Sequence, residues 1–438
     1  MILFIFQLVF YFVLGFSFVF FRRGYIGALA ILVGAFFPYS PIFSAYFYYS
    51  GATVFDFFII GVGIGALTLS FYSNVRFYLS LRSVLLISSF LLFLLISVII
   101  SSTNANVTLI SALKDLKPVL LVFTLLYAYK IMISFNGIVL KDVVPASSLN
   151  AFMFSSVFPL ILCMKLFFFL YLNSHGYLSS GSEDDFYVTD SEMLHRYADF
   201  SIIFVFIFTL FSLSSRVLPS IDPSYYSFLG IIMSGVAGNR TFFVIFLILL
   251  VYSLFRVHRT FFYLLFFITS SFCVVSFLFL DLDIDTGGRF FSLLSYENIV
   301  RLLSIRYSPL FSLYDDGVGY FNLLFGLGLG TLFYIPWFTY RDGIDPYSPF
   351  IDNFYLTIFA KFGLFGLFAV MFFLLSICFS SLRKGCARFL YPIIFIMYTT
   401  TMSFWYQSSF SYFAICWFTV LLFNFECERK LSKGYNYA

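Results

Sequence analysis

The stretch VLLISSFLLFLLISVIIS, residues 84–101, carries no charged side chain, and serine is its only polar residue. The hydrocarbon core of a bilayer is about 30 Å thick, and a helix of about 20 apolar residues crosses it. Outward from this run, comparable apolar stretches recur along the whole chain. They lie near 2–21, 24–47, 51–72, 118–134, 150–172, 199–215, 224–238, 241–255, 260–280, 353–379, 389–406 and 408–425. The sequence therefore predicts an all-α integral membrane protein with about 12–13 transmembrane helices.

The composition indicates the same class. Of the 438 residues, 61% are hydrophobic and 11% are charged, whereas a soluble domain has about 25% charged residues. The net charge of +4 is too small to indicate a nucleic-acid partner. The six cysteines show no spacing typical of a disulfide framework. The apolar N-terminus runs past Arg22 and Arg23 into more apolar sequence, so we interpret it as a first span rather than a cleavable signal.

Lysine and arginine residues gather between the apolar stretches, and two predicted spans fit between each neighbouring pair of clusters. The clusters are Arg22-Arg23, Arg76 with Arg82, Lys130 with Lys141, Arg216, Arg256 with Arg259, Arg383-Lys384 with Arg388, and Arg429-Lys430 with Lys433. Because cytoplasmic loops are rich in basic residues, all clusters are predicted to face the cytoplasm. Residues 1–438 then form a single polytopic membrane domain with two large outer loops, an acidic one at 173–198 and a longer one at 281–352. Long ordered loops are where function usually lies.

Arg240 lies between two apolar stretches at the predicted outer face, where it departs from the pattern of basic clusters. An arginine at a membrane boundary is costly unless it is paired or functional. Its alternative role is to reach the lipid phosphates with a long flexible side chain.

Residues 289–306 open the longer outer loop and repeat apolar residues every three to four positions, which predicts an amphipathic helix on the outer membrane surface. Glu297 and Arg301 are spaced i,i+4 in the favourable order. Arg289 follows two glycines, where backbone can approach a ligand closely, and Arg306 ends the segment. Arginine donates in a rigid fork and suits a pyrophosphate, although a surface helix with arginines that reach lipid phosphates has the same pattern.

Asp352 begins the apolar stretch at 353–379 and is predicted at the outer mouth of the helix bundle. It is either a helix N-cap or a base that takes the proton of an attacking sugar hydroxyl, and one residue can do both. Asn353 and Tyr355 in the first turn are candidate substrate-binding residues. No histidine or cysteine pair has metal-ligand spacing, and the glycine-rich stretch 326–330 lacks the Lys-Ser/Thr of a P-loop. We expect neither a metal nor a cofactor.

The order of these pieces resembles the O-antigen polymerase and O-antigen ligase family of envelope glycosyltransferases. The resemblance covers 235–370 and rests on GNRT at 238–241, Gly288-Arg289, NLLFGLGLG at 322–330 and DNFYLTIFAKFGLFG at 352–366. Arg306 followed after ten residues by Gly317 also resembles an Arg-x10-Gly pattern of such polymerases.

The resemblance implies a C-type glycosyltransferase-like fold with a large extracytoplasmic loop. It implies a polyprenyl-diphosphate-linked oligosaccharide as donor, no metal or nucleotide sugar, and polymerisation of repeat units into O-antigen-type polysaccharide. The site would face the periplasm in a bacterial inner membrane, in contact with membrane lipid, with a chain-length regulator as protein partner. Ligases of this family carry histidine where this chain has Asp352, and this departure favours a polymerase.

Other classes fit the residues less well. A transporter or lipid-linked oligosaccharide flippase needs polar residues deep inside its spans, and Asp56, Lys130 and Lys165 are too few to outline such a site. A membrane O-acyltransferase would need a histidine within a span, and all three histidines lie outside the predicted spans. An O-antigen ligase and a flippase are the alternatives to the polymerase.

Overall fold

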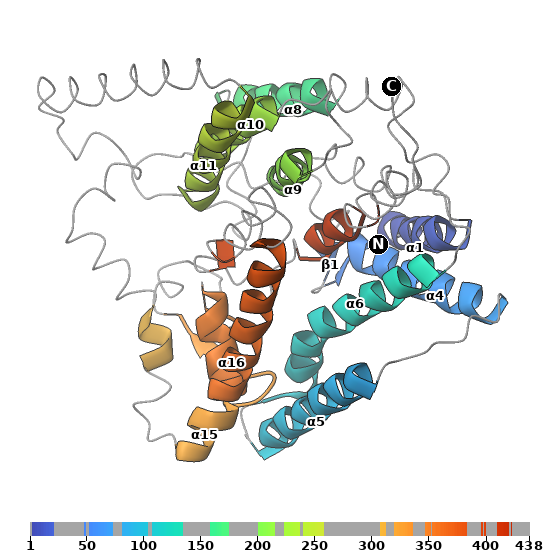
Figure 1. The fold of residues 1–438 in the computed structure, drawn as a ribbon, viewed down its shortest axis with the longest axis vertical. Coiled ribbons are helices and arrows are strands. Elements are labelled where there is room, and N and C mark those ends of the chain that lie inside the picture. Colours follow the sequence, from blue (N-terminus) through green and yellow to red (C-terminus); the bar gives the residue numbers. More distant parts are fainter. Residues whose placement is uncertain are drawn as a thin grey trace, which may run out of the picture. The chain divides into compact units, whose positions relative to one another are not determined.

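The computed structural model describes residues 2–21, 48–49, 52–72, 81–103, 107–134, 158–174, 200–214, 223–236, 240–257, 307–311, 319–335, 347–351, 353–382, 396, 398–399, 410–419 and 422. These residues are mainly helical (Figure 1). The helices are α1 (Ile2–Phe20), α4 (Val54–Tyr72), α5 (Leu81–Thr103), α6 (Leu109–Ser134), α8 (Phe158–Ser174), α9 (Phe200–Ser214), α10 (Pro223–Val236), α11 (Arg240–Val257), α15 (Tyr320–Phe325) and α16 (Phe354–Leu382), followed by a helix over Phe410–Thr419.

Among the described residues, three helical segments are long and apolar enough to cross a membrane, namely Val54–Tyr72, Ile110–Ile133 and Phe354–Phe372. Shorter apolar helices cover Ile5–Phe20, Leu91–Ser102, Thr241–Leu254 and Phe410–Thr419. The prediction of a helical membrane protein is therefore confirmed, whereas the total of 12–13 spans stays a prediction. The predicted spans at 24–47 and 260–280 lie outside the described residues.

Two features differ from the sequence-based expectation. Helix α6 begins at Leu109, well before the predicted span at 118–134, so Asp115 and Lys117 belong to a helix and not to the outer loop predicted at 102–117. Their charges are paired with other helices, and paired charges are tolerated inside an apolar helix.

The second difference is a small amount of β structure in a chain predicted to be all-α. Strand β1 (Tyr48–Tyr49) pairs antiparallel with β2 (Ala52–Thr53), and β3 (Phe333–Tyr334) pairs antiparallel with β4 (Tyr347–Ser348). Each strand has two residues, too few for an alternation of apolar and polar residues to be recognised. Both pairs lie in the chain before a long apolar helix, α4 for the first and α16 for the second.

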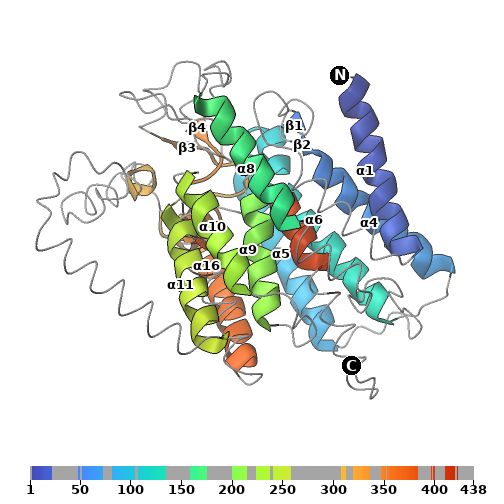
Figure 2. The ribbon, with the colours of Figure 1, turned by 90° about the horizontal axis from the view of Figure 1, so that it is seen from above.

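The chain divides into two compact units, one formed by Met1–Asn150 with Pro309–Ala438 and the other by Ala151–Ser308. This division into units does not test the prediction that residues 1–438 form a single polytopic membrane domain, which stays a prediction. In the second unit α10 packs against α9 and α11, and α10 and α11 run alongside each other (Figure 2). Aromatic rings fill this contact, with Phe206 edge-on to Phe246 and Phe208 4.7 Å from Tyr226 between ring centroids.

In the first unit α1 and α4 lie side by side (Figures 1 and 2). Their close approach requires glycine: a Cβ at Gly61 would lie 2.9 Å from the backbone nitrogen of Phe16, and one at Gly65 would lie 2.8 Å from the Phe16 carbonyl oxygen. Gly61 and Gly65 form the small-xxx-small spacing that lets membrane helices pack backbone to backbone.

A buried carboxylate, Asp56, joins α4 to two other helices. Its Oδ2 accepts from the backbone N–H of Thr53 at 2.8 Å and lies 3.2 Å from Lys117 Nζ on α6, and its Oδ1 accepts from the hydroxyl of Ser411. Thr53 in turn accepts from the Asp56 N–H at 3.3 Å, so the two residues cap the N-terminus of α4 reciprocally. Asp56 therefore has a structural role here.

Candidate functional site

Most of the residues predicted for the site lie outside the described residues. These are Asp352, Arg289, Glu297, Arg301 and Arg306. Arg240 is the first residue of α11, and its side chain is likewise outside the description. The predicted amphipathic helix at 289–306 also lies outside the described residues. Of the outer loop predicted at 173–198, only residues 173–174 are described, and they end α8. Their roles stay predictions.

Asn353 is described, and it caps α16. Its Oδ1 accepts a hydrogen bond from the backbone N–H of Leu356 at 3.0 Å, the N-cap to N3 arrangement that satisfies one of the orphan donors of a helix start. Of the two explanations considered for Asp352, a cap or a base, the capping role at the start of α16 is therefore held by its neighbour Asn353.

Tyr355 belongs to the same first turn of α16. Its hydroxyl lies 2.8 Å from Thr399 Oγ1, and Thr399 Oγ1 also lies 2.9 Å from the backbone carbonyl oxygen of Ile396. Asn353 and Tyr355 are thus brought together at the start of α16, where both make protein contacts. Neither contact tests the predicted role in substrate binding.

Helix α16 is interrupted at Gly363, whose φ of 67° and ψ of −164° are not helical. An interruption releases the carbonyl groups of the preceding turn from their helical partners. Here the released carbonyls accept from another segment: Leu327 N–H donates to Ala360 O at 2.8 Å, and Gly328 N–H donates to Lys361 O at 3.1 Å. Irregular backbone inside a membrane protein is tolerated where protein groups satisfy it in this way.

The segment that inserts here is Gly326–Gly330, with the sequence GLGLG, which we call the glycine segment. Its three glycines have φ between 80° and 90°, a region that side-chain-bearing residues rarely adopt. Space is also short: a Cβ on Gly328 would lie 2.7 Å from the Ser101 nitrogen, and one on Gly330 would lie 2.7 Å from the Ala112 nitrogen. The glycine segment therefore contacts α5, α6 and α16 with its backbone.

A buried ion pair fixes the end of this segment. Lys361 on α16 donates to Asp115 Oδ2 on α6, and the two side chains are 0% and 1% exposed. The same oxygen accepts the backbone N–H of Gly330 at 2.6 Å. Lys361 Nζ also lies 5.8 Å from the centroid of the Phe333 ring, within the range of a cation–π contact. One carboxylate oxygen thus ties together α6, α16 and the glycine segment.

Serine residues of α5 line the other side of the glycine segment. Ser101 Oγ lies 2.5 Å from the carbonyl oxygen of Leu329 and 2.9 Å from that of Ser97. Ser97 Oγ is buried and has no hydrogen-bond partner among the described residues. Thr331 Oγ1, just after the segment, returns to the Gly328 carbonyl at 2.9 Å. The segment is held by polar groups along its length.

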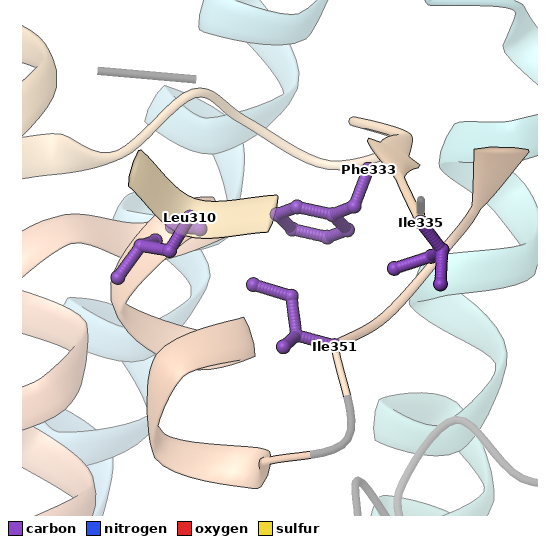
Figure 3. Packing of buried hydrophobic residues seen from close by; sticks show 5 residues of the cluster. Leu310, Phe333, Ile335 and Ile351 are labelled. Atoms are coloured by element: carbon purple, nitrogen blue, oxygen red, sulfur yellow. The ribbon is translucent and has the colours of Figure 1, made fainter. Parts of the chain in front are cut away.

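After the glycine segment the chain passes through a small apolar cluster of Leu310, Phe333, Ile335, Ile351 and Ala360. Figure 3 shows the first four side chains directed toward one another. Phe333 is in β3 and Ile351 follows β4, so this cluster and the β3–β4 pairing hold the chain before α16 against the helix itself. Thr357 strengthens the junction, because its Oγ1 lies 3.1 Å from both the nitrogen and the oxygen of Ile351.

Sequence reasoning missed Asp115 and Lys361 as members of one site. Lys361 is a lone charge within an apolar stretch, which is a signal for a functional or paired group, and this signal could have found it. Asp115 falls in the outer loop predicted at 102–117, where a charged residue is ordinary and does not indicate a site. The glycines at 326–330 entered the sequence analysis as a rejected P-loop and as part of the family resemblance, but not as partners of Asp115 or Lys361. Among the described residues no group of three or more His, Cys, Asp or Glu side chains could hold a metal ion.

The long apolar helices, the interrupted α16 and the inserted glycine segment together define a helical membrane protein with a charged pair buried in its helix bundle. The chain belongs to the Family of unknown function (DUF6369), whose model matches residues 16–433. No curated protein and no solved structure matches the chain.

Proposed function

We propose that this protein is a glycosyltransferase that polymerises polyprenyl-diphosphate-linked oligosaccharide repeat units at the periplasmic face of a bacterial inner membrane. The single observation that supports it most is the interlock of two stretches. Residues 322–330 and 352–366, which resemble O-antigen polymerases separately, are hydrogen-bonded to each other through Leu327 and Ala360 and through Gly328 and Lys361. Two of the four stretches that carry the resemblance are therefore joined in one structural element.

The cap at Asn353 adds a second line of support. Because Asn353 Oδ1 already accepts the Leu356 N–H, the carboxylate of Asp352 is not required to begin α16. In the proposed reaction, Asp352 accepts the proton of the acceptor sugar hydroxyl as its oxygen bonds to the anomeric carbon of the donor. The bond from that carbon to the diphosphate oxygen breaks, and the polyprenyl diphosphate leaves with the electron pair.

The leaving diphosphate gains negative charge as that bond breaks, and preorganised cations stabilise such charge. The proposal assigns this role to Arg240 and Arg289, with Arg301, Arg306 and Glu297 as further substrate-binding residues. Arginine is suited to it because the guanidinium stays charged and donates in a fixed fork. The reaction needs no metal, and a chain-length regulator is the expected protein partner.

The direct test is the surface polysaccharide of cells that lack the protein. A single repeat unit on the lipid core supports a polymerase. Polymer that is made but not attached to the core identifies a ligase, and loss of every repeat unit identifies a flippase, so either of these results overturns the proposal. The purified protein in liposomes, supplied with lipid-linked repeat units from the same cells, should form a ladder of longer products without added metal or nucleotide sugar.

A further inference from the structure

We propose that Asp115 and Lys361 are positioning residues that hold Ile351 and Asn353, the two chain neighbours of the proposed base, in place for catalysis, an inference that rests on the glycosyl transfer proposed above. Asp115 and Lys361 do not themselves contact the reacting atoms in this proposal. They act through two arms of the chain that start at the Asp115 carboxylate and end on either side of residue 352.

The first arm is the N-terminal part of α16. Lys361 lies eight residues after Asn353 on one continuous helical stretch, about 12 Å along the axis. Asn353 caps that stretch, and the interruption follows only at Gly363. A helix transmits position along its axis, so the ion pair between Lys361 and Asp115 sets the position of Asn353 relative to α6.

The second arm runs from Gly330, whose N–H is bound to the same Asp115 oxygen. Three residues later Phe333 is fully buried and lies in β3, which pairs with Ser348 and Tyr347 of β4. From β4 the chain reaches Ile351, which is buried and held by Thr357. This arm therefore sets the position of Ile351.

The ends of the two arms, Ile351 and Asn353, are hydrogen-bonded to each other. Ile351 N–H and C=O contact α16 through Thr357, and Asn353 N–H donates back to Ile351 O at 2.6 Å. The two arms start at the Asp115 carboxylate and come together again at Ile351 and Asn353. A change in the Asp115–Lys361 pair is therefore passed to both Ile351 and Asn353, and a displacement of about 1 Å in a catalytic group can cost about 10²-fold in rate.

The molecule contains a matched control pair on the same helix. Lys117, two residues after Asp115 on α6, pairs with Asp56 of α4 at 3.2 Å. Like the first pair, it joins α6 to another apolar helix, but the Asp56 carboxylate binds Thr53 and Ser411 instead of the glycine segment. The comparison is between Asp115→Asn/Lys361→Met and Asp56→Asn/Lys117→Met. Each double variant removes both charges, so neither leaves a buried charge without a partner.

The first measurement is hydrogen exchange of the full-length protein in detergent micelles. Asp115→Asn/Lys361→Met should speed exchange at Leu327, Gly328 and Gly330, and also at Ile351 and Asn353, by at least about tenfold, since exchange follows local opening. The control double variant should leave these amides unchanged. Faster exchange at the glycine segment alone, with Ile351 and Asn353 unchanged, overturns the link from the ion pair to these two residues.

The second measurement is kinetic, with lipid-linked repeat units as substrate. Because residue 352 is proposed to act in the chemical step, Asp115→Asn/Lys361→Met should lower kcat at least about tenfold and change KM less than about twofold. Equal kcat in the two double variants overturns the positioning role. If the wild-type protein transfers no sugar at all, the proposed function fails, whereas the exchange measurement still decides whether the ion pair is linked to Ile351 and Asn353.

Discussion

Asp115 and Lys361 are 246 residues apart in the chain and form an ion pair whose side chains are 1% and 0% exposed. Desolvating a pair that is buried this fully costs free energy, and removing only one of its two partners leaves an uncompensated buried charge. In this chain the pair also orders a third element, because Gly330 shares the Asp115 oxygen. Its removal therefore affects more than two side chains.

Replacement of Lys361 alone should destabilise the protein strongly. Lys361→Met leaves the Asp115 carboxylate buried without its cation, and we expect a loss of about 3–5 kcal/mol of unfolding free energy. Lys117→Met is the matched control: the Lys117 side chain is 36% exposed, and we expect a smaller loss. Thermal unfolding in detergent measures both. Asp115→Asn/Lys361→Met should recover part of the loss, and equal melting of the Lys361 and Lys117 single variants would contradict the prediction.

Gly363 should not tolerate alanine. A Cβ there would lie 2.6 Å from the Gly326 nitrogen, and the φ of 67° is costly for any side chain, by about 1–2 kcal/mol for the backbone alone. Gly235 of α10 offers a control, since a Cβ added there meets nothing within 4 Å. Gly235→Ala should leave the melting temperature unchanged or raise it, because alanine favours helix over glycine. A neutral Gly363→Ala would show that α16 is not interrupted at this residue.

Arg240 and Arg289 should be required for polymer formation. Alanine at either position removes a proposed phosphate contact, and we expect long polysaccharide chains to disappear while the amount of protein in the membrane is maintained. Lysine should rescue poorly, because it keeps the charge but loses the forked geometry. Gel analysis of cell-surface glycan, with immunoblots of the protein, measures this. Normal chain lengths in both alanine variants would exclude the phosphate-binding role.

The neighbours Asp352 and Asn353 should separate chemistry from helix capping. Asp352→Asn should abolish polymer formation with little change in melting temperature, because a positioned base contributes about 10²–10⁴-fold and the cap is on the next residue. Asn353→Ala should instead lower stability by about 1 kcal/mol, and Asn353→Asp should retain it. Wild-type chain lengths in Asp352→Asn would show that this carboxylate is not the base.

The loop that contains α15 should face the periplasm. Basic clusters at 256–259 and 383–388 flank the segment on either side, and such clusters stay in the cytoplasm. Tyr320 is 88% exposed and is a suitable site for a reporter fusion. A reporter that is active only in the periplasm should be active there. Activity of a cytoplasmic reporter at the same position would reverse the predicted topology.

The sequence predicted the elements that depend on composition and run length. The stretch 84–101 lies within α5, and the predicted span at 199–215 coincides with α9. The predicted boundaries were wrong where a charged residue was assigned to a loop. Asp115 lies inside α6, because its charge is neutralised by Lys361 from a distant part of the chain. A pairing across 246 residues leaves no trace in local hydropathy.

The candidate site was predictable only in part for the same reason. Residues 322–330 and 352–366 were recognised from their order, but their hydrogen bonds depend on the break at Gly363. A glycine in an apolar helix is common in membrane proteins, so nothing local distinguishes Gly363 from Gly61 or Gly65, which serve close helix packing. The capping role of Asn353 was likewise hidden beside Asp352, because either residue type caps a helix well.

The shared oxygen of Asp115 also bears on how the chain assembles during synthesis. Asp115 is translated 215 residues before Gly330 and 246 residues before Lys361, and domains generally fold from the N-terminus onward as they emerge. Until the ribosome has passed residue 330 the Asp115 carboxylate lacks both of these partners, and until it has passed residue 361 the carboxylate still lacks its cation. We therefore expect the first unit to complete its fold only after α16 has been inserted. A chain truncated within 331–360 should retain its early helices but leave the Asp115 carboxylate without its cation, where quality-control proteases can recognise it.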